Sequence, residues 1–466
     1  MLPRLVKHGF QGKIIATRPS VDLARIMLPD SGHIQEMETE WKNRKRARAG
    51  LPPKPPLYDV TDAEAVLPLF LDVNYDEIIS LSSSVKLRLR DAGHILGSAI
   101  VEIWLTEEDK SIKLVFSGDL GNSGQPIIRD PALLETADYL VLESTYGNRF
   151  HEPREQRRHH LAQIIQKTVA RRGNVIIPAF AIERTQDLLY DLSTLYREGE
   201  IPAQVKTYVD SPLATKATEV FIKNPGYYDH ETRQLLRQGY KPLSFENLQF
   251  VHTVEESKRL NAEATGSIII SASGMCDAGR IKHHLKHNLW RSEASVVLVG
   301  YQAEGTLGRR LQEGAKRVRI LGEEVAVKAQ IHNLSAYSAH ADQTALVNWV
   351  QSFNTMPRQV FLVHGEPDAL LVLARLLENK LGLKVIVPTS GEVATMTAKG
   401  VTFDSKPKTS TPSEKRTGLT SLQREVDELA RVLSPAMEQS YAEEIEQLVR
   451  AVQELRGQTE VAATGD

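Results

Sequence analysis

Short apolar runs alternate along this chain with longer stretches in which apolar residues recur every three or four positions. A short run fits a strand that is covered on both faces, and the wider spacing fits a helix with one apolar face. We predict buried strands over residues 113–116, 139–142, 175–177, 268–271, 296–299 and 360–363. We predict amphipathic helices over residues 155–171, 182–196, 341–352 and 368–381. This alternation of strands and helices predicts an α/β protein.

The C-terminal residues follow a different pattern. Residues 405–418 are rich in Ser, Thr, Lys and Pro, which is typical of a linker. Beyond them, apolar residues recur at alternating spacings of four and three, at Leu422, Val426, Leu429 and Leu433 and again at Ile445, Leu448, Val452 and Leu455. This spacing predicts a helical hairpin or short coiled coil over residues 419–466. Such an element either joins copies of the chain into a homo-oligomer or packs on its own chain.

Length, charge and cysteine content narrow the class of protein. A chain of 466 residues is too long for one core and favours two domains plus an appendage. Its net charge of −2 gives no global attraction to polyanions, although residues 42–48 carry five basic side chains that fit a solvated helix face or a nucleic-acid contact. Cys276 is the only cysteine, which excludes disulfides and favours a reducing compartment. Without an apolar run of membrane-spanning length, we expect a cytoplasmic protein with no membrane partner.

Three short segments carry side chains that suit a hydrolytic metal centre. His94 lies in residues 91–98, Asp119 in 116–121 and His364 in 363–366. Each of these side chains stands among small residues after a strand-like run, so a cation can approach it closely. Three ligands are nevertheless few for a two-metal hydrolase. A second group, His283, His284 and His287, fits the polar face of a helix better than a metal cluster.

These segments, taken with several others in the same order, resemble a known family. The matching segments are 91–98, 116–121, 142–147, 177–186, 210–213, 273–275, 300–308, 338–342 and 363–366. The chain resembles the β-CASP branch of the metallo-β-lactamase superfamily, which includes the nuclease subunit of the eukaryotic pre-mRNA 3′-end cleavage factor. The resemblance extends from Met1 to about Phe403.

The resemblance implies a fold and a domain order. The expected fold is an αββα metallo-β-lactamase sandwich, N-terminally incomplete in this chain, with an inserted β-CASP α/β domain and the C-terminal helical hairpin. Residues 1–147 and 332–404 would form the two parts of the metallo-β-lactamase domain. Residues 148–331 would form the β-CASP domain, 405–418 the linker and 419–466 the helical tail.

The resemblance also implies a role for each site residue. His94 would bind the first of two zinc ions, Asp119 would bridge both ions, and His364 would bind the second. Glu143 and His340 would form an acid–base pair that protonates the leaving oxygen. Hydroxide held between the two zinc ions would attack phosphorus. In this family a histidine at the position of His364 accompanies RNA substrates, so we expect a zinc-dependent RNA-processing ribonuclease.

The residues that bind the substrate are less marked in the sequence. Ser211, Arg309 and Arg310 are candidates because small residues and guanidinium groups suit contact with phosphate. Nothing in the sequence decides between endonuclease and exonuclease action on the RNA.

One motif of the family is missing from these residues. The family's His-x-His-x-Asp-His motif, which supplies four metal-binding side chains, does not occur in this sequence; in relatives it lies just ahead of a helix like residues 2–10. If four protein ligands hold a zinc ion with roughly 10–16 kcal/mol, losing half of them costs on the order of 6 kcal/mol, or about ten-thousandfold in affinity.

Three explanations for the missing motif remain. The natural protein starts upstream of Met1 and is an active ribonuclease, or it is a non-catalytic relative that binds RNA or a partner. The third explanation is a different hydrolase that acts on a small thioester or lactam. A small substrate needs neither the inserted domain nor residues 338–342, which disfavours the third explanation. The intact Glu143 and His340 favour the first, because nothing would maintain them in an inactive protein.

Overall fold

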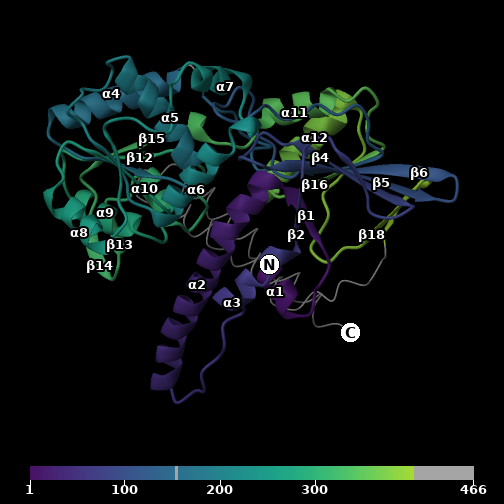
Figure 1. The fold of residues 1–466 in the computed structure, drawn as a ribbon, viewed down its shortest axis with the longest axis horizontal. Coiled ribbons are helices and arrows are strands. Elements are labelled where there is room, and N and C mark those ends of the chain that lie inside the picture. Colours follow the sequence, from purple (N-terminus) through teal and green to yellow (C-terminus); the bar gives the residue numbers. More distant parts are fainter. Residues whose placement is uncertain (153–155, 404–466) are drawn as a thin grey trace, which may run out of the picture. The chain divides into compact units, whose positions relative to one another are not determined.

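The computed structural model describes residues 1–152 and 156–403 (Figure 1). Residues 1–392 and 396–401 form one compact unit, which contains both large sheets. The predicted linker and helical tail, 405–466, lie outside the described residues. No helix in the described ranges is both long enough and apolar enough to cross a membrane.

The first large sheet has seven strands. In spatial order they are β17 (Val385–Ile386), β16 (Gln359–Val363), β7 (Tyr139–Glu143), β6 (Lys110–Phe116), β5 (Ala99–Glu107), β4 (Val85–Asp91) and β3 (Ile78–Ser80). Strands β3 to β6 form an antiparallel meander, and β6, β7, β16 and β17 are parallel. Helices α11 (Gln343–Gln351) and α12 (Pro367–Leu381) cover one face, where Leu346 and Leu373 pack on Val115 and Leu140 (Figure 1).

The second large sheet has six strands, all parallel. In spatial order they are β10 (Leu248–Phe250), β9 (Thr207–Val209), β11 (Ile268–Ser271), β8 (Val175–Pro178), β12 (Ser295–Leu298) and β15 (Gln330–Asn333). Its helices are α4 (Arg157–Ala170), α5 (Arg184–Arg197), α6 (Pro212–Lys223), α7 (His230–Arg237), α8 (Val254–Glu263), α9 (Ile281–Asn288) and α10 (Leu307–Gln312).

Both faces of this parallel sheet are buried under helices. Ile268 and Ile270 join the core formed with α4, α5 and α6, whereas Ile269 joins the core formed with α8, α9 and α10. Because successive side chains of a strand point to opposite faces, an unbroken apolar run is what a strand between two helix layers requires.

Smaller elements complete the described chain. They are α1 (Leu2–Lys7), β1 (Ile14–Thr17), α2 (Arg18–Arg48), α3 (Val60–Glu64), η1 (Leu67–Leu69), β2 (Phe70–Val73), η3 (Pro225–Tyr227), β13 (Arg317–Ile320), β14 (Glu323–Ala326), η4 (Ser335–Tyr337), β18 (Ala394–Thr397) and β19 (Gly400–Phe403).

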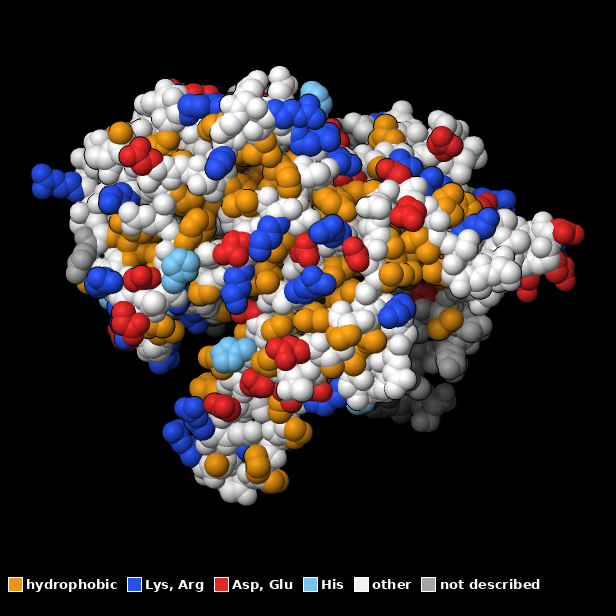
Figure 2. Space-filling view, in the orientation of Figure 1, with side chains coloured by type: hydrophobic (Ala, Val, Ile, Leu, Met, Phe, Trp, Pro, Cys, Tyr) orange, Lys and Arg blue, Asp and Glu red, His pale blue; other side chains and the backbone are white. Residues whose placement is uncertain are grey.

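On α2, Lys42 pairs with Glu38 at 3.0 Å and Arg44 with Glu40 at 3.6 Å, so part of the basic run is a salt-bridged helix face. Figure 2 shows basic and acidic side chains interspersed over the visible face, in keeping with the net charge of −2.

Within residues 1–152 and 156–403, the predicted strands and helices are present, with small differences. The helix predicted from residue 182 begins at Arg184, because Glu183 has a left-handed φ of +63° that no helix accommodates. The strand predicted as buried at 113–116 is only partly covered, since Phe116 is 38% exposed. The predicted domain boundary after residue 331 falls inside β15, which pairs with β12 along residues 330–333.

Candidate metal centre

Five predicted site residues meet at one edge of the seven-stranded sheet. Strands β4, β6, β7 and β16 run in the same direction, so their carboxyl ends lie at that edge. His94 follows β4, Asp119 follows β6, Glu143 ends β7, His364 follows β16, and His340 precedes α11. The fold therefore brings together side chains that the sequence places in five separate segments.

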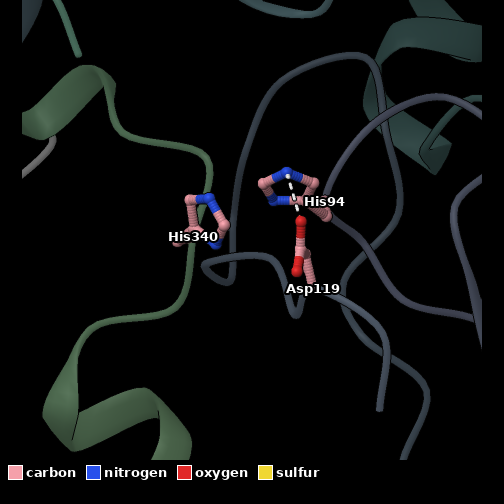
Figure 3. Close-up of side chains that lie close together, drawn as sticks. All are labelled: His94, Asp119 and His340. Carbon is pink, nitrogen blue, oxygen red and sulfur yellow. Dashed lines mark ion pairs between the residues drawn. The ribbon is translucent and has the colours of Figure 1, made fainter. Parts of the chain in front are cut away.

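Two glycines allow the loops after β4 and β6 to touch. Gly93 has a φ of +63°, and a Cβ added at Gly121 would lie 1.6 Å from the carbonyl oxygen of Gly93. No other residue fits position 121, because real Cβ atoms do not approach a backbone oxygen so closely. The amide of Gly121 donates to the carbonyl oxygen of Ala92 at 2.8 Å. This contact sets the His94 side chain beside Asp119 (Figure 3).

Asp119 faces two imidazole rings with its two carboxylate oxygens. Its Oδ2 lies 3.9 Å from Nε2 of His94, and its Oδ1 lies 3.0 Å from Nδ1 of His364. Figure 3 shows the ring of His340 next to that of His94, and the two ring centroids are 4.3 Å apart. Two sets of ligand atoms lie within 4.8 Å of one another: His94 with Asp119 and His340, and Asp119 with Glu143 and His364.

The donor set fits a divalent transition metal. Imidazole nitrogen and carboxylate oxygen are the ligands of catalytic zinc sites, and a carboxylate with two free oxygens can serve two ions. Burial lowers the pKa of His94 to about 3, so its ring stays neutral and keeps a lone pair for a metal. His364 and Asp119 are partly exposed, with side-chain exposures of 57% and 40%, and so are accessible from solvent.

The buried Glu143 and the partly buried His340 form an ion pair beside these ligands. Oε1 of Glu143 lies 3.1 Å from Nδ1 of His340 and accepts from the amide of Leu120 at 2.7 Å. Burial raises the pKa of Glu143, but the hydrogen bond and charge of His340 outweigh burial and hold the pKa below its ordinary value. Burial is the largest influence on the pKa of His340 and lowers it, but the hydrogen bond to Glu143 and the charges of Glu143 and Asp119 together outweigh burial and raise the pKa. The pair therefore favours a protonated imidazole that can donate a proton.

A second set of contacts fixes the segment that carries His340. Nε2 of His151 lies 2.9 Å from the carbonyl oxygen of His340. Asp342 caps α11 by accepting from the amide of Ala345 at 2.9 Å, and its other oxygen accepts from the amide of His151 at 3.2 Å. These contacts fix the backbone at His340 and the start of α11 next to it.

Glu183 is a supporting residue that the sequence did not reveal. It follows β8 of the parallel sheet, is 2% exposed, and its Oε2 accepts from the amide of Leu96 at 2.9 Å. Leu96 lies two residues after His94, so this bond connects the six-stranded sheet to the loop that carries His94. Burial, followed by the charge of Asp187, raises the pKa of Glu183. In the sequence Glu183 lies within residues 177–186, one of the segments that match the family, but the resemblance assigned it no role.

The three predicted substrate-binding residues do not meet. Arg309 lines a cavity beside the metal centre, whereas Arg310 lines another with Arg317 and Arg319. Ser211 is 5% exposed and caps α6 by accepting from the amide of Ala214 at 3.2 Å. Its candidate role in binding RNA stays a prediction, and the observed role of its hydroxyl is the helix cap.

The interpretation of three histidines on α9 needs one correction. His283 and His287 are exposed, as expected of a polar helix face. His284 is fully buried, and its Nε2 lies 2.7 Å from Oδ2 of Asp210. The prediction was wrong for His284 because a histidine can turn inward wherever a buried carboxylate offers a partner.

Comparison with known proteins supports the family resemblance found in the sequence. A Beta-Casp domain model matches residues 185–311, and a model of the Zn-dependent metallo-hydrolase RNA specificity domain matches residues 324–388. Ribonuclease TTHA0252 of Thermus thermophilus is 35% identical over 391 residues, which make up 84% of each chain. The chain belongs to the β-CASP metallo-β-lactamase family. This membership confirms the α/β fold class predicted from the sequence.

Other relatives in the β-CASP family are longer. Transcription termination factor FttA of Pyrococcus abyssi is 32% identical over 400 residues, and that of Thermococcus kodakarensis is 31% identical over 403. The alignments cover 84% of this chain but 59% of each FttA chain. The family thus includes a ribonuclease of similar length and termination factors that carry additional sequence.

Proposed function

We propose that this β-CASP protein is a zinc-dependent ribonuclease that hydrolyses phosphodiester bonds during RNA processing. One observation carries the proposal. The ligand-capable residues His94, Asp119 and His364 converge beside the Glu143–His340 ion pair. The similarity to a ribonuclease over 84% of both chains supports RNA as the substrate.

The residues present divide into ligands and a proton donor. His94 and Asp119 would hold one zinc ion, and Asp119 and His364 would hold the second. When bound, zinc supplies a Lewis acid that activates water and offsets negative charge on the phosphate. Asp119 directs one carboxylate oxygen toward each of the two imidazoles, so it would be able to supply a ligand to both ions.

His340 would deliver the proton that the leaving oxygen requires. Glu143 accepts from two backbone amides besides its contact with His340, those of Leu120 and Thr145, so its own position is fixed. A fixed carboxylate orients the imidazole and favours its protonated form. Proton transfer of this kind contributes roughly 10²–10⁴-fold to the rate.

The number of ligands limits the metal affinity of these residues. The His-x-His-x-Asp-His motif does not occur in the sequence, so each ion would have two of the proposed ligands. We therefore propose weak zinc binding and impaired activity for these 466 residues alone. A non-catalytic protein that binds RNA or a partner is the second candidate, and the same ligand count favours it.

The test combines RNA cleavage with zinc content. The purified protein is incubated with zinc and single-stranded RNA, alongside Asp119→Ala, His340→Ala and the control His283→Ala, whose side chain is exposed on α9. We expect Asp119→Ala to lose both cleavage and zinc. We expect His340→Ala to lose cleavage while retaining zinc, and His283→Ala to match the parent protein. Unchanged cleavage in the first two variants contradicts the assigned roles; RNA binding without any cleavage by the parent supports the second candidate.

A further inference from the structure

A cavity of about 340 Å³ lies directly beside the candidate proton donor. It is lined by aromatic and basic side chains, among them Tyr146, Arg149, Phe150, His151, Tyr301 and Arg309. A cavity of this size matches the lower end of small-molecule sites in proteins. Arginine with aromatic rings is the combination that binds nucleotides, since rings stack on bases and guanidinium groups contact phosphates.

The floor of this cavity is next to His340. The ring centroid of Tyr146 lies 6.2 Å from that of His340, and the His151 ring contacts the Tyr146 ring at 4.6 Å between centroids. His151 also lies 2.9 Å from the carbonyl oxygen of His340 through its Nε2. A nucleotide held here would therefore be close to the leaving oxygen that receives the proton from His340.

Phe150 stands between this cavity and a second one. The second cavity has a volume of about 640 Å³, and its lining includes Ala341, Asp342 and Trp349. Phe150 lines both cavities and is 64% exposed. A large apolar ring that remains exposed in this position offers a flat surface to a ligand. The two cavities together follow the segment that carries His340.

The charged side chains of the cavity are held in place. Nη2 of Arg149 lies 3.0 Å from Oε2 of Glu366, and the hydroxyl of Tyr301 donates to the other oxygen of Glu366. The Arg149 guanidinium lies 5.6 Å from the Tyr301 ring centroid. Arg309, at 31% side-chain exposure, is paired with Glu313 at 2.6 Å. The rings and the cations are thus arranged before a ligand arrives, which lowers the entropic cost of binding.

We propose that this cavity is a nucleotide subsite, in which a base of single-stranded RNA stacks on Phe150 or Tyr301 while Arg149 and Arg309 contact the adjacent phosphates. The subsite rests on the proposed ribonuclease function and names the form of its substrate. Only an unpaired base can leave its neighbours and stack on a protein ring, so double-stranded RNA does not fit.

The test measures RNA binding without cleavage. A fluorescein-labelled hexa-adenylate RNA is titrated with the protein in EDTA, and its anisotropy gives Kd. We expect Phe150→Ala and Tyr301→Ala to raise Kd by about 5–100-fold, as loss of one stacked base does. Tyr301→Phe keeps the ring and should bind like the parent protein. Arg309→Ala should lower the slope of log Kd against log salt by about 0.7.

Two positions outside this cavity serve as controls. Trp290→Ala removes another exposed aromatic ring, 56% exposed, and Arg317→Ala removes an arginine that lines a different cavity and, like Arg309, is paired with a glutamate. Both should leave Kd within about twofold of the parent, and thermal unfolding verifies that each variant is folded. The subsite is refuted if Phe150→Ala and Tyr301→Ala bind as tightly as Trp290→Ala, or if duplex RNA binds as well as the single strand. Because zinc is absent, this result is independent of whether Asp119→Ala abolishes cleavage.

Discussion

Individual residues at the centre are fixed by few but specific contacts. The sequence predicted the ligand-capable residues and the Glu143–His340 pair, because each stands in a motif that the family shares. It did not predict the role of Glu183, which accepts a hydrogen bond from the amide of Leu96 in the loop that carries His94. No local pattern encodes a contact between segments so distant in the chain.

The Glu183 contact leads to a prediction at this scale. Glu183→Ala leaves the buried amide of Leu96 without its acceptor, which costs about 1–3 kcal/mol of stability. It should also weaken zinc binding by about 10–100-fold, as loss of a residue that orients a ligand does. Glu183→Gln keeps an acceptor oxygen and should restore both. Urea unfolding and zinc titration measure the two effects; equal losses in the Gln and Ala variants would contradict a role for the acceptor oxygen.

Among the elements, the regular strands and helices were predictable and their mutual packing was not. The apolar run at 268–271 predicted a strand, because a strand buried on both faces has no polar side. The exposure of Phe116 was not predictable, because a strand's sequence does not show how much of each face its neighbours cover. For the same reason the sequence did not predict the cavity lined by Tyr301, because the shape of that cavity depends on how several loops pack.

A buried charge cluster spans three strands of the meander. Glu102 on β5 is fully buried and pairs with Arg88 on β4 and Lys113 on β6, each at 2.5 Å. Burial raises the pKa of Glu102, but its hydrogen bonds with Arg88 and Lys113 outweigh burial and hold the pKa below the ordinary value. The cluster connects adjacent strands through side chains in addition to their backbone hydrogen bonds.

This cluster predicts acid sensitivity. With the folded pKa below the unfolded value of about 4.3, the stabilisation by Glu102 is full above that pH and is lost as pH falls through the folded pKa. Glu102→Gln leaves the buried Lys113 and the partly exposed Arg88 without their charged partner and should cost about 3 kcal/mol at pH 7. As pH falls below the unfolded pKa of about 4.3, the difference between the variant and the parent should shrink. Urea unfolding from pH 7 to pH 3 measures the difference in unfolding free energy between the variant and the parent, with Glu107→Gln at an exposed position as the control. A difference that stays constant over that range would contradict the ion pairing of Glu102.

For the whole molecule, the sequence predicted two α/β domains and an added helical tail. The helical tail at 419–466 lies outside the described residues, so its part in a homo-oligomer stays a prediction. If the tail associates, deleting residues 419–466 should reduce an oligomer to a smaller species while the two sheets stay folded, because their cores lie within residues 1–392. Light scattering gives the mass, and an unchanged subunit count would exclude the tail as the association element.

The pairing of β7 with β16 has a consequence for synthesis in the cell. Glu143 and His340 are 197 positions apart, and the parallel sheet between them spans most of that interval. At roughly 5–20 residues per second, a ribosome takes on the order of 10–40 s to proceed from β7 to β16. Until residue 340 is made, the nascent chain holds His94, Asp119 and Glu143 but neither His340 nor His364. If the protein cleaves RNA as proposed, it would lack that activity until the ribosome has passed residue 364.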